Sequence, residues 1–504
     1  MTGMFQYMAY LEKLNLNNFK TENVEDMQEM FQYCTHLRSI DLSGFITSKV
    51  KNMDRMFSSC QSLSSLDLSS FDTKEVNSMN YIFFDCRSLV YLNIVNFDVS
   101  NVSQMNSMFY SCTSITSLDL SSFITRKVDS MESIFSQCKS LTYLDISNFD
   151  TSKLTSMDYF FEGCSSLTSL DISSFTTTNV KSFRSMFRRC SNLSSLDLSG
   201  FNTSNAVTLD SMFSDCFSLK KVEVSSFDTS KVTSMIGIFD NCISLKSLDV
   251  SNFNINEVTY MNNMFFNCSS LEKLDLHNFI GKKITLLNSM FGNCHKLASI
   301  NLSNLESSPI RIDSMFENCY SLEHVEMPKL ITDNIDYTVQ LFENCTSLAS
   351  VNINYSFKSV KILDKMFKNC YSLKSVNLSN FKSNKLESLN SAFENCISLT
   401  SLNLSNFITD KVIDMDNVFN NCTSLTTLIV PFNTENTIRM RNMFGSCMML
   451  SSLDISTFNT KNVKNFTDMF LNDDGLDLYV NFSKCSNLKE NLPVYINVHD
   501  VSQK

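Results

Sequence analysis

The sequence predicts an α/β solenoid of about 18 or 19 coils, with a parallel sheet on one side and short helices on the other. Three observations lead to this prediction. Cysteines recur every 25 or 26 residues, a phenylalanine recurs three positions before each cysteine position, and a strand-like pattern precedes a helix-like one in each repeat. A repeat this short cannot bury its own apolar face, so neighbouring repeats must stack. We expect residues 1–472 to form the solenoid, starting in the middle of a repeat, and residues 473–504 to form a C-terminal cap.

The cysteines define the period. Seventeen of the 18 lie on one lattice from Cys34 to Cys447, and only Cys485 lies outside it. The phenylalanine that precedes each cysteine position is present in all 19 repeats, and a second one follows it in 16 of 18 repeats, with Leu305 and Leu330 in the other two. A residue so uniform within one chain is most simply a packing residue that contacts its own copies.

Each repeat contains two apolar periods. Leu66, Asp67 and Leu68 alternate as the residues of a short strand do. Thr73 then stands where an N-cap is expected. The apolar residues that follow have the spacing of one helix face, which predicts a short helix, and they are Val76, Met79, Ile82, Phe83 and Cys86.

The composition excludes several classes of partner. Lys plus Arg is 41 and Asp plus Glu is 52, which gives a net charge of −11 and argues against a nucleic-acid partner. No stretch has the 18 or more apolar residues of a membrane span, and no secretory signal precedes the first repeat. We therefore expect no direct membrane span.

The cysteines are predicted to form a buried column of free thiols, with Cys acting as a small apolar residue. No Cys-x-x-Cys pair or Cys/His cluster occurs, so the sequence predicts no metal site and no cofactor. Disulfides between coils are not expected, because packed helices lie farther apart than a disulfide spans.

The residue between the two strand leucines should point outward. Seven consecutive repeats place an acid there, and we call them the acidic stripe: Asp119, Asp145, Asp171, Asp197, Glu223, Asp249 and Asp275. Stacked carboxylates repel, so Ser hydroxyls, solvent, cations or a basic partner must offset the charge. The alternatives are a hydrated face that only confers solubility, a binding stripe for basic protein segments, and a calcium site.

The face changes in the second half of the chain, where Asn301, Asn352, Asn377 and Asn403 occupy the same position. This change could divide the surface into two binding zones, or it could be drift. No cap precedes Met4, and an uncapped coil exposes apolar surface and a strand edge. We therefore expect a missing N-terminal part, a partner, or end-to-end self-association.

The motif "SLDLSSFDTKEVNSM" at Ser65–Met79, together with "SLTSLDISSFTTTNV" and the following "SMFRRC", resembles the repeat of BspA-like leucine-rich-repeat surface proteins. Leu63, Leu66 and Leu68, followed by Phe71, have the matching leucine-rich spacing. The resemblance covers about residues 1–472. It implies an adhesion or recognition protein at the cell surface or outside the cell, with a host or extracellular-matrix protein as ligand.

The resemblance implies no catalytic residues, and no nucleophile elbow, P-loop or dinucleotide fingerprint occurs. The sequence thus favours a non-enzymatic protein-interaction solenoid. An intracellular scaffold built from the same repeat is the alternative, and the lack of a visible signal sequence favours it.

Overall fold

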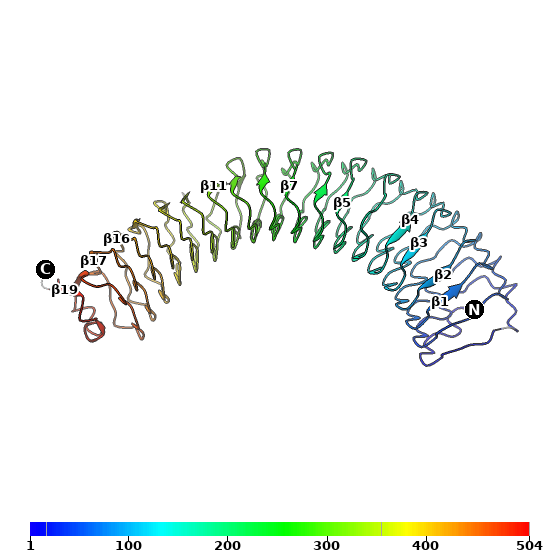
Figure 1. Ribbon diagram of the computed structural model, residues 1–504, viewed down its shortest axis with the longest axis horizontal. Coiled ribbons are helices and arrows are strands. Elements are labelled where there is room, and N and C mark those ends of the chain that lie inside the picture. The colour runs from blue at the N-terminus through cyan, green and yellow to red at the C-terminus, as the bar shows by residue number, and fades with distance from the viewer. Residues whose placement is uncertain (17, 354, 503–504) are drawn as a thin grey trace. The chain divides into compact units, whose positions relative to one another are not determined.

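The computed structural model describes residues 1–16, 18–353 and 355–502, and the chain forms two compact units, Met1–Phe253 and Asn254–Lys504. Each unit is a parallel β-solenoid in which successive coils lie side by side (Figure 1). The described residues form about 17 coils, against the 18 or 19 predicted. The stacking of repeats into a parallel solenoid is therefore confirmed, whereas the division at residue 472 stays a prediction.

The strands are short and parallel. The strands of the first unit are β1 (Ser65–Asp67), β2 (Tyr91–Asn93), β3 (Ser117–Asp119), β4 (Tyr143–Asp145), β5 (Ser195–Leu196), β6 (Lys221–Val222) and β7 (Ser247–Leu248). In the β1–β2 pair, Leu66 lies opposite Leu92, and each residue thus meets its equivalent in the next coil. Leu66 is buried while its neighbours are exposed, as the alternating pattern predicts.

The second unit has the same strand arrangement with two additions. Its elements are β8 (Lys273–Leu274), β9 (Ser299–Asn301), β10 (Glu306–Ser307), β11 (His324–Glu326), β12 (Lys329–Leu330), β13 (Ser350–Asn352), β14 (Ser375–Asn377), β15 (Ser401–Asn403), β16 (Thr427–Ile429), β17 (Ser452–Asp454), β18 (Asp477–Val480), η1 (Lys489–Asn491) and β19 (Asn497–Asp500). The strands β10 and β12 form an extra parallel pair. The strands β17, β18 and β19 form a three-stranded sheet near the C-terminus.

The segment predicted as a helix is not helical, so that part of the predicted fold class is wrong. From Met79 to Asp85, every second N–H donates to a carbonyl of the next coil, as Tyr81 N does to Asn106 O at 2.8 Å. Phe84 N and Cys86 N instead close turns within the coil, as Phe84 N does to Tyr81 O at 3.1 Å. An α-helix would need bonds to the carbonyl four residues back. In the described part of the chain the one helical element is η1, a single 3₁₀ turn.

Left-handed residues explain this backbone. Tyr81 and Asp85 have φ angles of 59° and 60°, and such a pair, four residues apart, recurs ten times in the first unit and nine times in the second. A left-handed residue interrupts a right-handed helix. The turn segment still returns to the same side every three or four residues, so Met79, Ile82 and Phe83 are fully buried as predicted. The apolar spacing therefore predicted correctly which residues point inward, but it did not predict the backbone conformation that places them there.

The core consists of stacked columns of identical side chains. In the first unit the rings of Phe31 and Phe57 lie 5.5 Å apart and nearly parallel. In the second unit Phe316 and Phe342 lie 5.2 Å apart at an angle of 6°. Offset stacking of aromatic rings stabilises a core beyond the apolar area that it buries. The predicted packing role of this column is therefore confirmed.

The cysteines form the predicted column of free thiols. All 18 are free and buried. The Cys86 Sγ donates a hydrogen bond to the Phe57 carbonyl at 3.1 Å, and the equivalent bond recurs from coil to coil, as in Cys319 to Phe291. Burial raises the pKa of the Cys86 thiol to about 12. Because the thiolate is the reactive form, these cysteines are inert packing residues.

Thr73 does not cap a helix, because no helix follows it. Its hydroxyl donates to the Asp98 carbonyl in the next coil at 2.9 Å and accepts the Asp98 N–H at 2.7 Å. The same reciprocal pair joins Thr125 and Asp150. Each buried threonine therefore satisfies both backbone groups of one residue in the next coil, which ties the coils together at a corner where no strand pairing does so.

Candidate functional site

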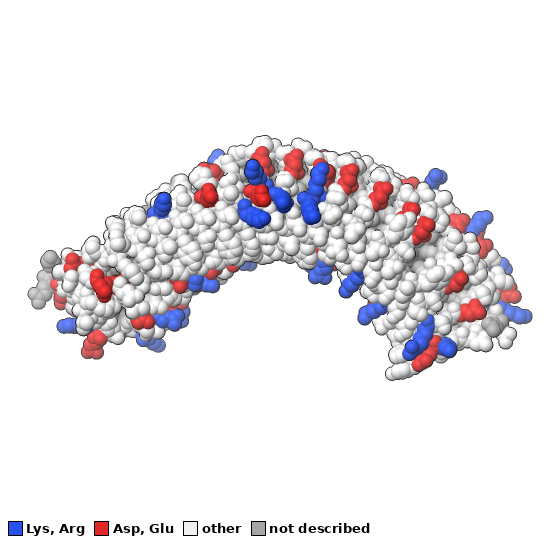
Figure 2. Space-filling view, in the orientation of Figure 1, with Lys and Arg blue, Asp and Glu red and all other residues white. Residues whose placement is uncertain are grey.

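The acidic stripe lies on the strand side of the coils. In the first unit Asp119 and Asp145 are opposite each other in the β3–β4 pair. Asp171, Asp197, Glu223 and Asp249 follow at equivalent positions, and Asp275 belongs to the second unit. All seven side chains are exposed except Asp145 and Glu223, which are half-buried. Figure 2 shows acidic side chains at regular intervals along one edge of the visible face.

Serine residues hold the stripe carboxylates. The Asp119 Oδ1 accepts hydrogen bonds from the Ser121 hydroxyl at 2.6 Å and from the Ser121 N–H at 3.0 Å. Ser173 makes the same pair of bonds to Asp171. These bonds favour the ionised form, so they hold the pKa of Asp119 and of Asp171 below its usual value. Serine thus offsets part of the repulsion that the sequence predicts between neighbouring acids.

Two stripe positions have a basic neighbour on their own coil. Lys221 Nζ lies 2.8 Å from Glu223 Oε1. His277 Nδ1 lies 2.8 Å from Asp275 Oδ1, and hydrogen bonds from His277 lower the pKa of that carboxyl. The acids from Asp119 to Asp197 are instead held by hydroxyl and backbone donors. Their charge is therefore oriented by the protein and not cancelled.

Two tyrosines beside the stripe were not singled out by the sequence. Tyr91 and Tyr143 take a strand position that is serine in many coils, and they are 55% and 53% exposed. The pKa of Tyr143 is raised, chiefly by the negative charge of Asp145. With Val90 and Val95, also exposed, they add apolar surface to an otherwise polar face. The change from serine to tyrosine at this strand position was visible in the sequence and could have indicated the exposed apolar surface.

A shallow hollow of about 270 Å³ lies on the stripe itself. It is lined by Tyr143, Leu144, Asp145, Ile146, Ser147, Asp171, Ser173 and Ser174. An aromatic ring, two carboxylates and several hydroxyls therefore converge within the first unit. This is a surface that can contact a side chain bearing a cation and an alkyl stem, such as lysine or arginine.

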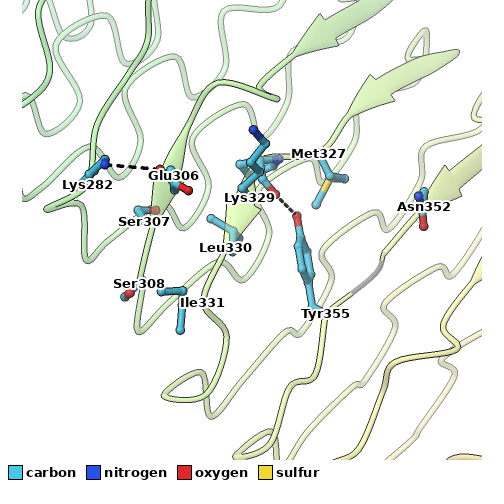
Figure 3. Close-up of a pocket in the computed structure, with 11 residues that line it drawn as sticks. Lys282, Glu306, Ser307, Ser308, Met327, Lys329, Leu330, Ile331, Asn352 and Tyr355 are labelled. Carbon is cyan, nitrogen blue, oxygen red and sulfur yellow. Dashed lines mark hydrogen bonds and ion pairs between the residues drawn. The ribbon is translucent and has the colours of Figure 1, made fainter.

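A larger hollow, of about 630 Å³, lies in the second unit where the repeat is irregular (Figure 3). It surrounds the extra strand pair β10–β12 and includes Leu330, one of the two leucines that replace the second phenylalanine. The sequence showed this irregularity as a leucine for a phenylalanine and as repeats of 25 residues, but did not predict a hollow there.

No group of three or more His, Cys, Asp or Glu side chains in the described ranges could hold a metal ion. Within those ranges, no helix has both the length and the apolar character needed to cross a membrane.

Comparison with known sequences identifies one family. Five overlapping segments match a family model described as "Mycoplasma protein of unknown function, DUF285", at residues 1–123, 115–222, 207–325, 310–405 and 387–492. No curated protein matches the sequence.

Solved leucine-rich-repeat structures are similar at low identity. A leucine-rich cell surface protein from Faecalibacterium prausnitzii is 17% identical, with 78% of this chain and 87% of that chain covered and a TM-score of 0.31. A leucine-rich-repeat protein from Eubacterium ventriosum is 14% identical, with coverages of 82% and 88% and a TM-score of 0.32. The functional domain of InlJ from Listeria monocytogenes, which includes a cysteine ladder, is 13% identical, with coverages of 94% and 74% and a TM-score of 0.21.

Proposed function

The chain belongs to the family described as Mycoplasma proteins of unknown function, DUF285, and we propose that it is a non-enzymatic protein-interaction solenoid. In this proposal it is displayed on the cell surface or secreted and acts in adhesion or recognition. Its ligand is a protein, with a host or extracellular-matrix protein as the leading class. The acidic stripe contacts basic segments of that ligand.

One observation carries the proposal: each coil presents its variable side chains on a face that the core does not use. The inward positions repeat leucine, phenylalanine, threonine and cysteine, and the threonine hydroxyls and cysteine thiols bond to neighbouring coils. The outward strand positions instead carry Asp119, Tyr143 and Asp145, oriented but not enclosed. Repeat proteins recognise partners through extended surfaces of this kind.

The experiment is capture of protein partners by the full chain, before and after neutralising the stripe. The variant carries Asp145→Asn, Asp171→Asn and Asp197→Asn. The matched control, Glu272→Gln with Glu323→Gln and Glu435→Gln, removes the same charge from exposed positions of the second unit. We expect the stripe variant to lose at least ten-fold in affinity for a partner and to lose most of the salt dependence, while the control changes neither. Equal binding by both variants would contradict the role of the stripe.

The alternative is an intracellular scaffold built from the same repeat. Labelling of intact source cells with a membrane-impermeant reagent separates the two. Modification of exposed lysines on intact cells favours the surface protein, whereas modification only after lysis favours the scaffold.

A further inference from the structure

The hollow in the second unit exists because two neighbouring repeats lose a ring and one of them loses a residue. Elsewhere in this unit the second phenylalanine column stacks, as Phe432 and Phe458 do at 6.2 Å. At Leu305 and Leu330 no ring fills that space, and the strands β10 and β12 pair there through Lys329 N to Leu305 O at 2.8 Å and Ile331 N to Ser307 O at 2.8 Å. In and beside β12, Lys329 and Ile331 are exposed, while Leu330 between them is half-buried.

The threonine tie is also absent at this place. Ser307 takes the threonine position and is 3% exposed, but its hydroxyl has no hydrogen-bond partner among the described residues. Its backbone carbonyl, and not its hydroxyl, receives the N–H of the next coil. This corner of the coil is therefore held by strand pairing, which opens the surface beside it.

The walls of the hollow combine apolar and charged groups. Ile331 is 60% exposed, and Tyr355 closes the opposite side, where its hydroxyl donates to the Pro328 carbonyl at 2.5 Å. Figure 3 shows Lys282 and Glu306 on one side of β12 and Tyr355 on the other. Ile331 therefore adds exposed apolar surface to the wall of the hollow.

The charge of the lining is positive in a chain whose net charge is −11. Lys282 and Lys329 line the hollow with one acid, Glu306, which pairs with Lys282 at 3.6 Å. In the described part of the chain, no ion pair is found for Lys329. The charge therefore complements a carboxylate, in contrast to the charge of the acidic stripe.

We propose that this hollow binds an extended segment of a partner protein that carries an aliphatic side chain two positions from a carboxylate. Lys329 and Ile331 are two residues apart and both exposed, so they lie on one face of the extended backbone. A peptide chain lying beside them places side chains with the same two-residue spacing against the ammonium group and the apolar wall. This inference rests on the proposed protein-binding function and adds a second contact of opposite charge to the stripe.

The test uses the full chain and a fluorescein-labelled heptapeptide, Ser-Leu-Ser-Glu-Ser-Leu-Ser, which contains the spacing in both directions. Fluorescence polarisation compares it with the same peptide carrying glutamine for glutamate. We expect the glutamate peptide to bind at least ten-fold more tightly, Lys329→Glu to remove that preference, and Ile331→Ser to weaken the binding of both peptides. The controls Lys411→Glu and Ile408→Ser change exposed residues of a different coil and should leave binding unchanged.

Equal affinity for the two peptides, or unchanged binding by Lys329→Glu, would overturn the inference. Displacement of the peptide by octanoate at the same concentration would also overturn the inference. The hollow would then bind a small carboxylate that has no peptide chain. Circular dichroism melting shows that each variant is folded. Failure here leaves the proposed function standing if the stripe variant still loses its captured partner. Failure of both tests rejects the function as well.

Discussion

The two units differ at a backbone position that they share, the left-handed residue before each cysteine. In the second unit this residue is asparagine in seven successive coils. Six of them are joined by bonds in which the side-chain amide of one asparagine donates to the side-chain carbonyl of the asparagine in the preceding coil, at 2.6–2.8 Å. We call these six residues the asparagine ladder: Asn293, Asn318, Asn344, Asn369, Asn395 and Asn421. In the first unit the same position holds Ser111, Gln137, Gly163 and Arg189, with φ angles between 60° and 71°. Asparagine tolerates the left-handed conformation better than most residues.

The comparison teaches that the repeat can be held in two ways. The second unit combines a favourable left-handed residue with a continuous ladder, and its strand face is largely neutral. The first unit has no asparagine at that position from Ser111 to Arg189, and a bond of the ladder type joins Asn241 Nδ2 to Asp215 Oδ1 at 2.8 Å near its end. This unit instead concentrates acids on its strand face. The cysteine column also ends differently, with Met8 half exposed in the first unit and Asp473 only 3% exposed in the second.

Replacing Asp473 with cysteine should have the largest effect. Both carboxylate oxygens are buried without a hydrogen-bond partner among the described residues, and this desolvation raises the pKa of Asp473 to about 7. The raised pKa makes the folded state most stable below the unfolded pKa, and stability is lost as the pH rises through 7. By linkage the loss is at most about 4 kcal/mol.

Urea denaturation of the full chain at pH 4.5 and pH 8 measures this. Asp473→Cys should stabilise the protein at pH 8 and much less at pH 4.5, with hydrogen exchange slowed in peptides near the C-terminus. The control Glu490→Gln, at an exposed position near the C-terminus, should change neither. A stabilisation of equal size at both pH values would mean that the Asp473 carboxyl does not titrate in this range.

Breaking the asparagine ladder should have the next largest effect. Asn344 donates to Asn318 Oδ1 and accepts from Asn369 Nδ2, at 2.6 Å each, with φ at 63°. Asn344→Val removes two bonds and places a β-branched residue in the left-handed region, which costs about 3 kcal/mol in total. Ser111→Val in the first unit has only the backbone penalty, about 1–2 kcal/mol.

Urea denaturation of both variants checks the difference between the units. Asn344→Gly separates the cost of the lost hydrogen bonds from the cost of the backbone conformation. Glycine adopts the left-handed conformation readily, so this variant loses only the two side-chain bonds. Equal destabilisation by Asn344→Val and Ser111→Val would show that the ladder bonds contribute nothing beyond the backbone preference.

These positions also show what a single sequence can predict. The period, the inward residues and the buried thiols followed from spacing alone, because residues such as Phe57 and Cys60 must meet their own copies. The turn segment could not be recognised, since Val76, Met79 and Phe83 have the same spacing in a helix and in this ribbon. The asparagine before each cysteine from Cys268 to Cys422 was the local evidence for a left-handed residue and against a helix.

The surface was predicted less completely. The outward direction of the acidic stripe followed from the strand alternation, but its serine partners required the position of Ser121 relative to Asp119. The hollow beside β12 could not be predicted, because Leu330 reads as a conservative replacement of phenylalanine. Its consequence appears only when β10 pairs with β12.

Introducing an asparagine into the first unit should have a smaller, stabilising effect. Ser111 has a φ angle of 61° and follows the same turn as Asn344. Ser111→Asn should stabilise the protein by about 0.5–1 kcal/mol through the backbone preference alone. Adding Gln137→Asn should give more than the sum of the two single changes if a ladder bond forms between neighbouring coils. Strict additivity in urea denaturation would show that two asparagines do not form such a bond.

The smallest expected effect concerns the acidic stripe and has the opposite pH dependence to Asp473. Hydrogen bonds from Ser121 and Ser173 lower the pKa of Asp119 and of Asp171 in the folded state. Their contribution to stability is present above the unfolded pKa of about 4 and is lost as the pH falls below it. Ser121→Ala with Ser173→Ala should therefore reduce stability slightly at pH 6 and leave it unchanged at pH 2.5.

Hydrogen exchange of the full chain resolves this effect by region. Amides around β3 and β4 should exchange faster in the double alanine variant at pH 6, whereas amides of the asparagine ladder should not change. Low pH therefore weakens the first unit at the stripe, whereas high pH weakens the second unit at Asp473. We expect the first unit to open more readily at low pH and the second unit to open more readily at high pH. A variant whose exchange rises equally in both units would show that the serine bonds act on the whole chain and not on the stripe.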